Sequence, residues 1–282
     1  MSHKQQRLSL LLFGRIKMKS AVFALIALIP FNSYGIIGGV EVSDSDSIAQ
    51  TAAQVWCINP KNRKQFAECS GIVIAKDLVV TAAHCTFLDA KSSDSPLGLK
   101  DMFVYLGKFD AKKGFQKNFL YKIASYKVHP EYEGSASGND VAILKLQREL
   151  PDELRPIAFL PSDENLHEQE KVVVAGFGFR KFNKQDFSPP LQKYEKYRVA
   201  SLPENSSRIT VRGAWGKGSY QGDSGGPAFV IRDQRLLLWG VFSEYFADSN
   251  GLVGLSSYDD LRQSKDWINA TASELGSSFR LD

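Results

Sequence analysis

Eight short apolar runs, each five to nine residues long, restrict the fold more than any other feature of the sequence. They are rich in β-branched and aromatic residues and bounded by turn formers, which is the pattern of β-strands. Only residues 258–275 differ, because Leu261, Trp267 and Ile268 recur there at helical spacing and predict a closing helix. We therefore expect a mostly β chain, either one sandwich or two small barrels packed together. The runs lie at residues 54–58, 70–75, 77–84, 102–107, 141–146, 171–179, 227–231 and 236–243.

The composition is that of a globular protein with a substantial core. Of the 282 residues, 43% are hydrophobic and 23% are charged, which argues against a disordered chain and allows one large or two modest domains. The sequence contains no internal repeat and no Gly/Ser-rich spacer, so any two halves should share an interface.

The basic residues are concentrated at the start of the chain. The formal net charge is +4, but residues 1–35 carry five Lys or Arg and no acid, so the remainder has a net charge of −1. This distribution removes the main support for a nucleic-acid partner. Lys17 and Lys19 precede an apolar run at 21–31. That run is shorter than the roughly 20 residues of a spanning helix and has the length of a signal-peptide core.

Small residues end this leader and predict where it is removed. Ser33 and Gly35 stand at the two positions that a signal peptidase recognises, so we expect cleavage between Gly35 and Ile36. The mature protein would then be secreted or periplasmic, without stable membrane insertion. An uncleaved anchor is the alternative. Met18 is an alternative start, because residues 18–35 already contain every part of a signal peptide.

The chain contains three cysteines, which fits an oxidising destination. Cys69 and Cys85 can pair and leave Cys57 single. Cys57 alternates with apolar neighbours as a strand residue does, so we expect it to be buried and inert. Three thiols without Cys-x-x-Cys spacing and only four histidines argue against a zinc site.

Three polar residues stand out beside the predicted strands. His84 lies in "TAAHC" at the end of one strand, Asp140 lies in "GNDVAILKL" at the start of another, and Ser224 lies in "QGDSGGP". Each alone is typical of a structural residue or of a surface turn. Together they supply a nucleophile, a general base and an orienting carboxylate, which is the set that activates a hydroxyl.

The order of these motifs resembles the chymotrypsin and trypsin family of serine peptidases. The similar segments are "IIGG" (36–39), "CSGIVIA" (69–75), "TAAHC" (81–85), "GNDVAILKL" (138–146), "AGFGF" (175–179) and "QGDSGGP" (221–227). His84, Asp140 and Ser224 follow one another in the family's order. The resemblance covers nearly all of residues 36–270.

The resemblance implies an all-β fold of two packed six-stranded antiparallel β-barrels with a C-terminal α-helix. The peptidase domain would occupy residues 36–282, with barrel halves at roughly 36–150 and 151–257 and the helix at 258–275. It also implies a disulfide between Cys69 and Cys85 beside the catalytic histidine. Residues 111–122 are basic where calcium-binding relatives carry acids, so we expect no calcium site and no other metal or cofactor.

The resemblance further assigns roles around Ser224. The backbone N–H groups of Gly222 and Ser224 would form the oxyanion hole. A free α-amino group on Ile36 would pair with Asp223 and shape that hole. The residue before Ile36 is glycine, where relatives usually carry a basic residue, and the predicted signal-peptidase site is the same bond. We therefore expect export and activation to be one event, without a separate zymogen.

The primary substrate pocket is where the sequence departs from the family. Trypsin-like members place an acid six residues before the serine, whereas this chain has Gly218, so a preference for Lys or Arg is not implied. Tyr220 stands where the first cysteine of a pocket disulfide would be. For the pocket wall, an alignment through "LLWG" (237–240) competes with one through "LWGVFSEY" (238–245). We prefer the second, because it lets Ser243 contact the catalytic aspartate.

The preferred alignment places Glu244 and Tyr245 in the wall, where Trp and Gly are usual. Tyr245 would either cap the pocket and favour small side chains, or turn outward and line a deeper apolar slot. Glu244 would either attract a basic substrate residue or lie solvated at the rim.

The sequence thus predicts a monomeric serine endopeptidase that hydrolyses protein or peptide substrates through an acyl-enzyme, with a protein inhibitor as a further candidate partner. A binding or regulatory module with weak or no catalysis is the alternative, and an esterase with the same chemistry is another.

Overall fold

The computed structural model describes residues 36–89, 93–106, 115–135, 138–180, 190–202, 206–248 and 253–281. The predicted signal peptide at 1–35 lies outside these residues. The described part of the chain contains thirteen strands, four short 3-10 helices and one α-helix. This confirms the all-β fold with a C-terminal helix.

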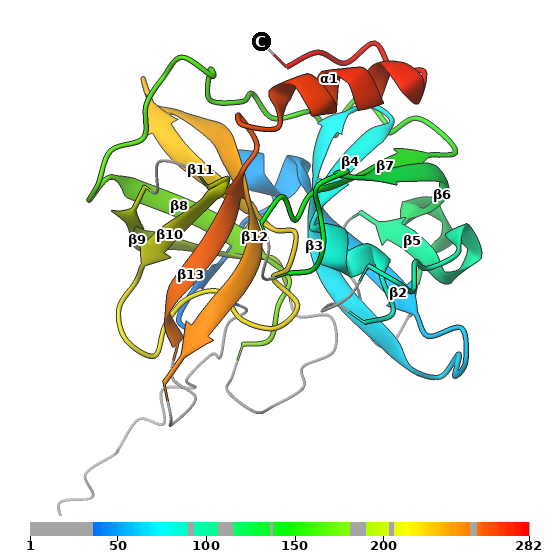
Figure 1. Ribbon diagram of the computed structural model, residues 1–282, viewed down its shortest axis with the longest axis horizontal. Helices are drawn as coiled ribbons and strands as arrows, with labels where there is room; N and C mark the ends of the chain where they lie inside the picture. Colours follow the sequence, from blue (N-terminus) through cyan, green and yellow to red (C-terminus); the bar gives the residue numbers. More distant parts are fainter. Residues whose placement is uncertain are drawn as a thin grey trace, which may run out of the picture. The chain divides into compact units, whose positions relative to one another are not determined.

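Six strands close into a first antiparallel barrel, seen beside the second one in Figure 1. The order around the barrel is β2-β3-β4-β7-β6-β5, and β2 pairs with β5 to complete it. Strand β6 was not among the predicted runs, because its apolar residues alternate with polar ones that face outward. The strands are β2 (Ala52–Ile58), β3 (Phe66–Ala75), β4 (Leu78–Thr81), β5 (Met102–Tyr105), β6 (Leu120–Val128) and β7 (Ala142–Leu146).

The second barrel has the order β9-β10-β13-β12-β11-β8 and is completed by the pairing of β8 with β9. A further short strand, β1 (Val40–Glu41), pairs with the first two residues of β9. The segment that follows Ile36 therefore belongs to the sheet of the second barrel, although the chain then enters the first. The strands are β8 (Lys171–Gly176), β9 (Gln192–Ser201), β10 (Arg208–Arg212), β11 (Pro227–Arg232), β12 (Arg235–Ala247) and β13 (Val253–Asp260).

The two barrels share a continuous apolar interface, as the absence of a spacer predicted. Strand β8 shows how it forms, because side chains alternate between the two faces of a strand. Val172 and Val174 point into the core of the second barrel. Val173 and Ala175 point the other way, into the cluster that contains the core of the first barrel. One strand thus contributes to both cores and fixes the position of the barrels against each other.

The closing helix α1 (Lys265–Glu274) is shorter than predicted. Residues 258–260 belong to strand β13, where they pair with β10 and β12, so the helix cannot begin at Tyr258. The helical spacing of Trp267 and Ile268 was interpreted correctly, and Ile268 is fully buried against the first barrel. Figure 1 shows α1 lying across that barrel close to β4 and β7.

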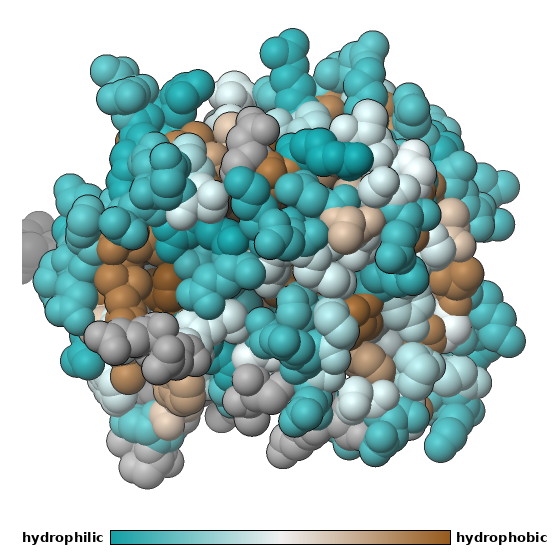
Figure 2. Space-filling view, turned by 45° about the horizontal axis from the view of Figure 1, so that its top comes forward, coloured by the Kyte–Doolittle hydropathy of each residue, from teal (hydrophilic) through white to brown (hydrophobic). Residues whose placement is uncertain are grey.

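Within the described residues, no helix combines the length and the apolar character needed to cross a membrane. The face shown in Figure 2 is covered mainly by hydrophilic side chains, with hydrophobic ones in separate groups between them. Among the described residues, the buried apolar side chains form two large clusters, one for each barrel core.

Candidate active site

His84 and Asp140 come from two segments that neighbouring strands bring together. Strand β4 ends at Thr81, and the chain turns into a short 3-10 helix, η2 (Ala83–Thr86), that carries His84. Residues 77–84 were predicted as one strand. The strand instead ends at Thr81, and His84 follows three residues later. Asp140 precedes β7, and β7 pairs with β4. The pairing places the two residues side by side.

The Asp140 carboxylate binds His84 with both oxygens. Oδ1 accepts a hydrogen bond from the backbone N–H of His84 at 2.8 Å, and Oδ2 lies 2.7 Å from the ring nitrogen Nδ1. The hydroxyl of Ser243 donates a further hydrogen bond to Oδ2 at 2.6 Å. Asp140 is fully buried, so these contacts replace water as its hydrogen-bond donors. They fix both the position and the tautomer of the imidazole.

The two groups stabilise each other's charged forms. Burial lowers the pKa of His84, but the charge of Asp140 and its hydrogen bond outweigh burial and raise the pKa above its ordinary value. Burial raises the pKa of Asp140, but His84 and the hydroxyl of Ser243 outweigh that and hold the pKa below its ordinary value. Asp140 therefore stays ionised, and His84 takes up a proton more readily than an ordinary histidine.

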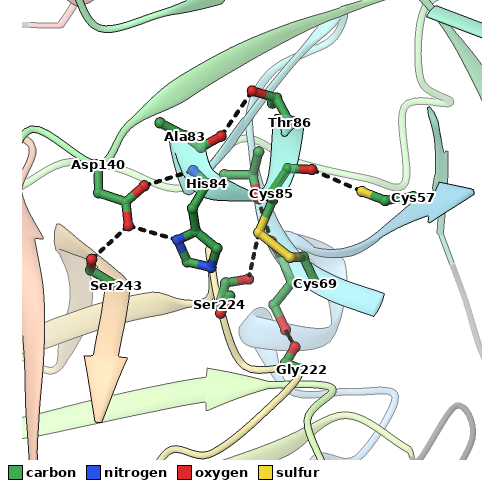
Figure 3. The surroundings of a disulfide bond; sticks show 12 residues. Cys57, Cys69, Ala83, His84, Cys85, Thr86, Asp140, Gly222, Ser224 and Ser243 are labelled. Carbon is green, nitrogen blue, oxygen red and sulfur yellow. Dashed lines mark hydrogen bonds and ion pairs between the residues drawn. A yellow bond between two sulfur atoms is a disulfide. The ribbon is translucent and has the colours of Figure 1, made fainter. Parts of the chain in front are cut away.

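Ser224 lies across the barrel interface from Asp140 and close to the His84 ring. Figure 3 shows the ring between Asp140 on one side and Ser224 on the other. The carbonyl of Ser224 accepts a hydrogen bond from the backbone N–H of Ser70 in β3 at 2.6 Å. The first barrel thus supplies the histidine and also holds the turn that carries the serine.

Gly222 is required by the conformation of this turn. Its φ is +91°, in the left-handed region that favours glycine, and a Cβ there would lie 2.8 Å from the Cα of Gly178. Its carbonyl accepts a hydrogen bond from the hydroxyl of Ser70 at 3.0 Å. The N–H of the same peptide unit, which belongs to Asp223, donates to the carbonyl of Tyr220 at 3.1 Å, so both polar groups of this unit are held within the protein.

The disulfide implied by the resemblance is present between Cys69 and Cys85. It joins β3 to the 3-10 helix that carries His84 (Figure 3). Because both sulfurs are used in this bond, the grouping of Cys69, Cys85 and His84 offers no thiolate to a metal. Cys57 is a free thiol and is buried, as its strand position predicted. Its Sγ lies 2.9 Å from the carbonyl oxygen of Cys85.

Asp223 is buried beneath the serine turn. Its Oδ1 accepts the backbone N–H of Gly178 and its Oδ2 that of Tyr220, each at 2.8 Å. Burial raises its pKa to about 7, although these two hydrogen bonds act in the opposite direction. Ile36 is also fully buried, in the core of the second barrel. Its φ is +47°, which is strained for a β-branched residue.

A cavity of about 460 Å³ lies beside His84 and Ser224. His84, Gly222 and Ser224 line it, and so do the wall residues Ser243, Glu244 and Tyr245. The contact of Ser243 with Asp140 supports the alignment through residues 238–245. The ring of Tyr245 packs inward against Tyr220, with the centroids 4.8 Å apart, so it lies beside the cavity.

Gly218 is not among the residues that line this cavity. It pairs with Ile37 through both backbone hydrogen bonds, Ile37 N–H to its carbonyl at 2.9 Å and the reverse at 2.8 Å. A Cβ at position 218 would lie 1.9 Å from the hydroxyl of Tyr197. A side chain is therefore excluded here by a tyrosine of the barrel core.

Comparison with known proteins agrees with this geometry. The family model described as Trypsin matches residues 43–268. The chain belongs to the trypsin family. A granzyme-like protein 2 of Rattus norvegicus is 30% identical over 72% of this chain and 79% of its own length. A trypsin of Tyrophagus putrescentiae is 28% identical over 84% and 80%, and a trypsin of Phaedon cochleariae is 26% identical over 76% and 82%, respectively.

Membership of the trypsin family supports a serine peptidase, yet two residues next to Asp140 were missed by the sequence reasoning. Arg208 begins β10 and Asp259 lies near the end of β13, and both are largely buried. Neither lies in one of the six segments on which the resemblance was based. One sequence signal could have indicated Asp259. It is one of two consecutive acids that directly follow Tyr258, which the structure buries, in a segment that was predicted to be helical.

Proposed function

We propose that this protein is an exported serine endopeptidase in which His84, Asp140 and Ser224 form the catalytic triad. The observation that carries the proposal is the 2.7 Å contact between Asp140 Oδ2 and His84 Nδ1, in a cavity that His84 shares with Ser224. His84 and Ser224, far apart in the sequence, line one cavity, and the fully buried Asp140 contacts the histidine ring. Family membership favours peptides over small esters as substrates.

In the proposed reaction the hydroxyl of Ser224 attacks the scissile carbonyl. Nε2 of His84 accepts the hydroxyl proton and then gives it to the leaving amine, which leaves an acyl-enzyme on Ser224. Water repeats these steps, releasing the acid and regenerating the serine. Asp140 stays ionised and stabilises the imidazolium, as the direction of its pKa requires. The backbone N–H groups of Gly222 and Ser224 would bind the oxyanion, and one such donor contributes about 3 kcal/mol.

Activation would follow cleavage before Ile36. In the full chain the Ile36 nitrogen is part of a peptide bond, and its strained φ exists only while the preceding carbonyl is attached. Cleavage between residues 35 and 36 would remove this constraint and create an ammonium. Asp223 is a buried carboxylate with a raised pKa, so an ammonium that reached it would stabilise its ionised form.

The specificity would differ from that of a tryptic enzyme. Gly218 supplies no carboxylate, and the tyrosine hydroxyl under it leaves no space for one. Tyr245, packed against Tyr220, narrows the adjoining wall. We expect neutral, small side chains to be accepted in preference to Lys or Arg, and a peptide library would test this by the residue found before each cut.

The proposal is tested on protein expressed as the full chain and recovered after export. N-terminal sequencing should return Ile36 as the first residue, and a fluorophosphonate probe should label the wild type. Ser224→Ala and His84→Ala should abolish labelling, and Ser162→Ala, an exposed serine outside the site, should not. Absence of labelling in folded protein that begins at Ile36 would favour the binding module. Faster turnover of small esters than of any peptide would favour the esterase.

A further inference from the structure

A second layer of buried charge lies close to Asp140. It consists of Ser207, Arg208 and Asp259, contributed by β10 with its preceding residue and by β13. The side chain of Arg208 is 14% exposed and that of Asp259 is 1% exposed. Burying two ionisable groups is unfavourable unless they contact partners, so the contacts they make deserve a functional explanation.

Arg208 reaches Asp140 through Ser243. Its Nη2 donates to the hydroxyl oxygen of Ser243 at 3.2 Å and to the carbonyl of Ser135 at 2.6 Å. A guanidinium has only donors, so the Ser243 oxygen must accept here. The single hydroxyl proton of Ser243 is then left for Asp140, 2.6 Å away. Arg208 and the ionised Asp140 thus both require the Ser243 hydroxyl to point toward Asp140, and Arg208 holds the Ser243 oxygen from the other side.

Asp259 holds the backbone on which Asp140 stands. Its Oδ1 accepts the hydroxyl of Ser207 at 2.9 Å, and the Ser207 oxygen in turn accepts the backbone N–H of Asn139 at 3.1 Å. The backbone N–H of Asp140 also acts on the Asp259 carboxylate and lowers its pKa, against the larger effect of burial. Asn139 has a φ of +52°, in a region that a non-glycine residue rarely adopts. Side chains of the second barrel therefore hold a strained turn of the first.

We propose that Arg208 and Asp259 are positioning residues that orient Asp140 and set the charge that it presents to His84. The inference rests on the proposed triad and goes beyond it by assigning a role to two residues that contact no substrate. The two barrels would be coupled at this point, because Asp140 precedes a strand of the first and both partners belong to the second.

The two residues act on His84 in opposite directions. The positive charge of Arg208 lowers the pKa of His84, whereas the negative charge of Asp259 raises it, each less than burial and Asp140 do. Burial and the charge of Asp140 raise the pKa of Asp259, and Arg208 opposes this. Other titratable groups close to Arg208 are Tyr132, whose pKa is raised by burial, and the half-exposed Glu244, whose carboxylate lies 3.7 Å away.

This opposition provides a test that a merely structural role would not satisfy. Arg208→Met keeps most of the aliphatic stem but removes the charge, so the pKa of His84 should rise. Asp259→Asn keeps the shape and removes the opposite charge, so the pKa of His84 should fall. Arg208→Lys should keep the pKa of His84 near that of the wild type, but should not restore full turnover, because an ammonium cannot reproduce the fork of contacts.

A pair of residues at the end of β13 and just after it provides matched controls. Arg262 and Asp260 form a similarly buried pair, with side chains 11% and 3% exposed and 2.6 Å between Arg262 Nη2 and Asp260 Oδ2. This pair is not among the groups that shift the pKa of His84. Arg262→Met and Asp260→Asn should therefore lower stability without moving that pKa.

Two readouts separate this inference from the proposed function. The pH dependence of kcat/KM reports the pKa of His84 in the free enzyme, and kcat of Arg208→Met should fall roughly ten- to a hundredfold, as for a lost hydrogen bond to a charged group. NMR titration of ¹⁵N-labelled histidine, with His84 assigned from His84→Ala, reports the same pKa without turnover. Shifts of opposite sign support the positioning role. Shifts of the same sign, no shift, or equal shifts in the controls overturn it. An inactive wild type that still shows the opposite shifts would refute only the peptidase.

Discussion

The ionisation of Asp223 should make stability depend on pH in one form of the protein and not in the other. While Ile36 is joined to Gly35, burial raises the pKa of Asp223 from 3.8 to about 7. Between these two values the folded state holds a proton that the unfolded state has released. Stability must therefore fall as pH rises through this interval.

The size of the fall follows from the two pKa values. Each pH unit within the interval changes the free energy of unfolding by about 1.4 kcal/mol. The loss is therefore ~4 kcal/mol across the whole interval and roughly 2.5 kcal/mol between pH 5 and pH 8. After cleavage before Ile36, an ammonium paired with Asp223 would lower its pKa, and this loss should disappear.

Urea unfolding at pH 5 and pH 8 measures the effect. Gly35→Leu replaces the small residue that the signal peptidase is expected to recognise, so the protein stays uncleaved. Ser224→Ala in all samples prevents self-digestion. Asp223→Asn in the uncleaved form removes the titration and serves as the reference for every other ionisable group. The reasoning is refuted if the uncleaved protein loses no more stability than its Asp223→Asn variant, or if the cleaved protein loses as much as the uncleaved one.

Three further predictions concern local chemistry. Gly222→Ala should lower kcat on the order of a hundredfold or more, because the added Cβ would lie 2.8 Å from the Cα of Gly178 and displace an oxyanion donor. Ester hydrolysis by the purified protein measures kcat, and an unchanged value would contradict this prediction. Cys57 should not react with a thiol reagent in the folded protein, since burial raises its pKa to about 12, and should react once urea is added; labelling at equal rates in both states would contradict its burial. Replacing Cys69 and Cys85 by Ala should lower the free energy of unfolding by about 3 kcal/mol, given a sequence separation of 16, and an unchanged urea midpoint would disprove this.

The sequence predicted strands whose buried faces are apolar and missed strands whose apolar pattern is interrupted, among them β13, which is buried but contains Ser256, Ser257, Asp259 and Asp260. β7 and β8 read as continuous apolar runs, because one side packs in a barrel and the other against its neighbour. β9 carries Lys, Glu and Arg on its outer face, so its apolar residues are diluted to an alternating pattern. The helix was begun too early: the helical spacing of Leu261, Trp267 and Ile268 was extended back to Tyr258, which is paired in β13.

The candidate site was predicted to the extent that it lies in contiguous motifs. His84, Asp140 and Ser224 each stand in a run of distinctive neighbours, so the resemblance found them. Arg208 and Asp259 acquire their environment only through the pairing of β10 with β13, across 50 residues of intervening chain. Their burial depends on that pairing, and no local pattern encodes it.

The pairing of β1 with β9 carries a consequence for biosynthesis. Val40 finds its partner only when Lys193 is in place, so the beginning of the folded unit waits for a segment that is made much later. Ile36, a few residues before Val40, is buried in a barrel whose strands begin at Lys171. A nascent chain in which only the first barrel has been synthesised therefore cannot yet bury Ile36. The cavity is completed only after the strands of the second barrel have been made.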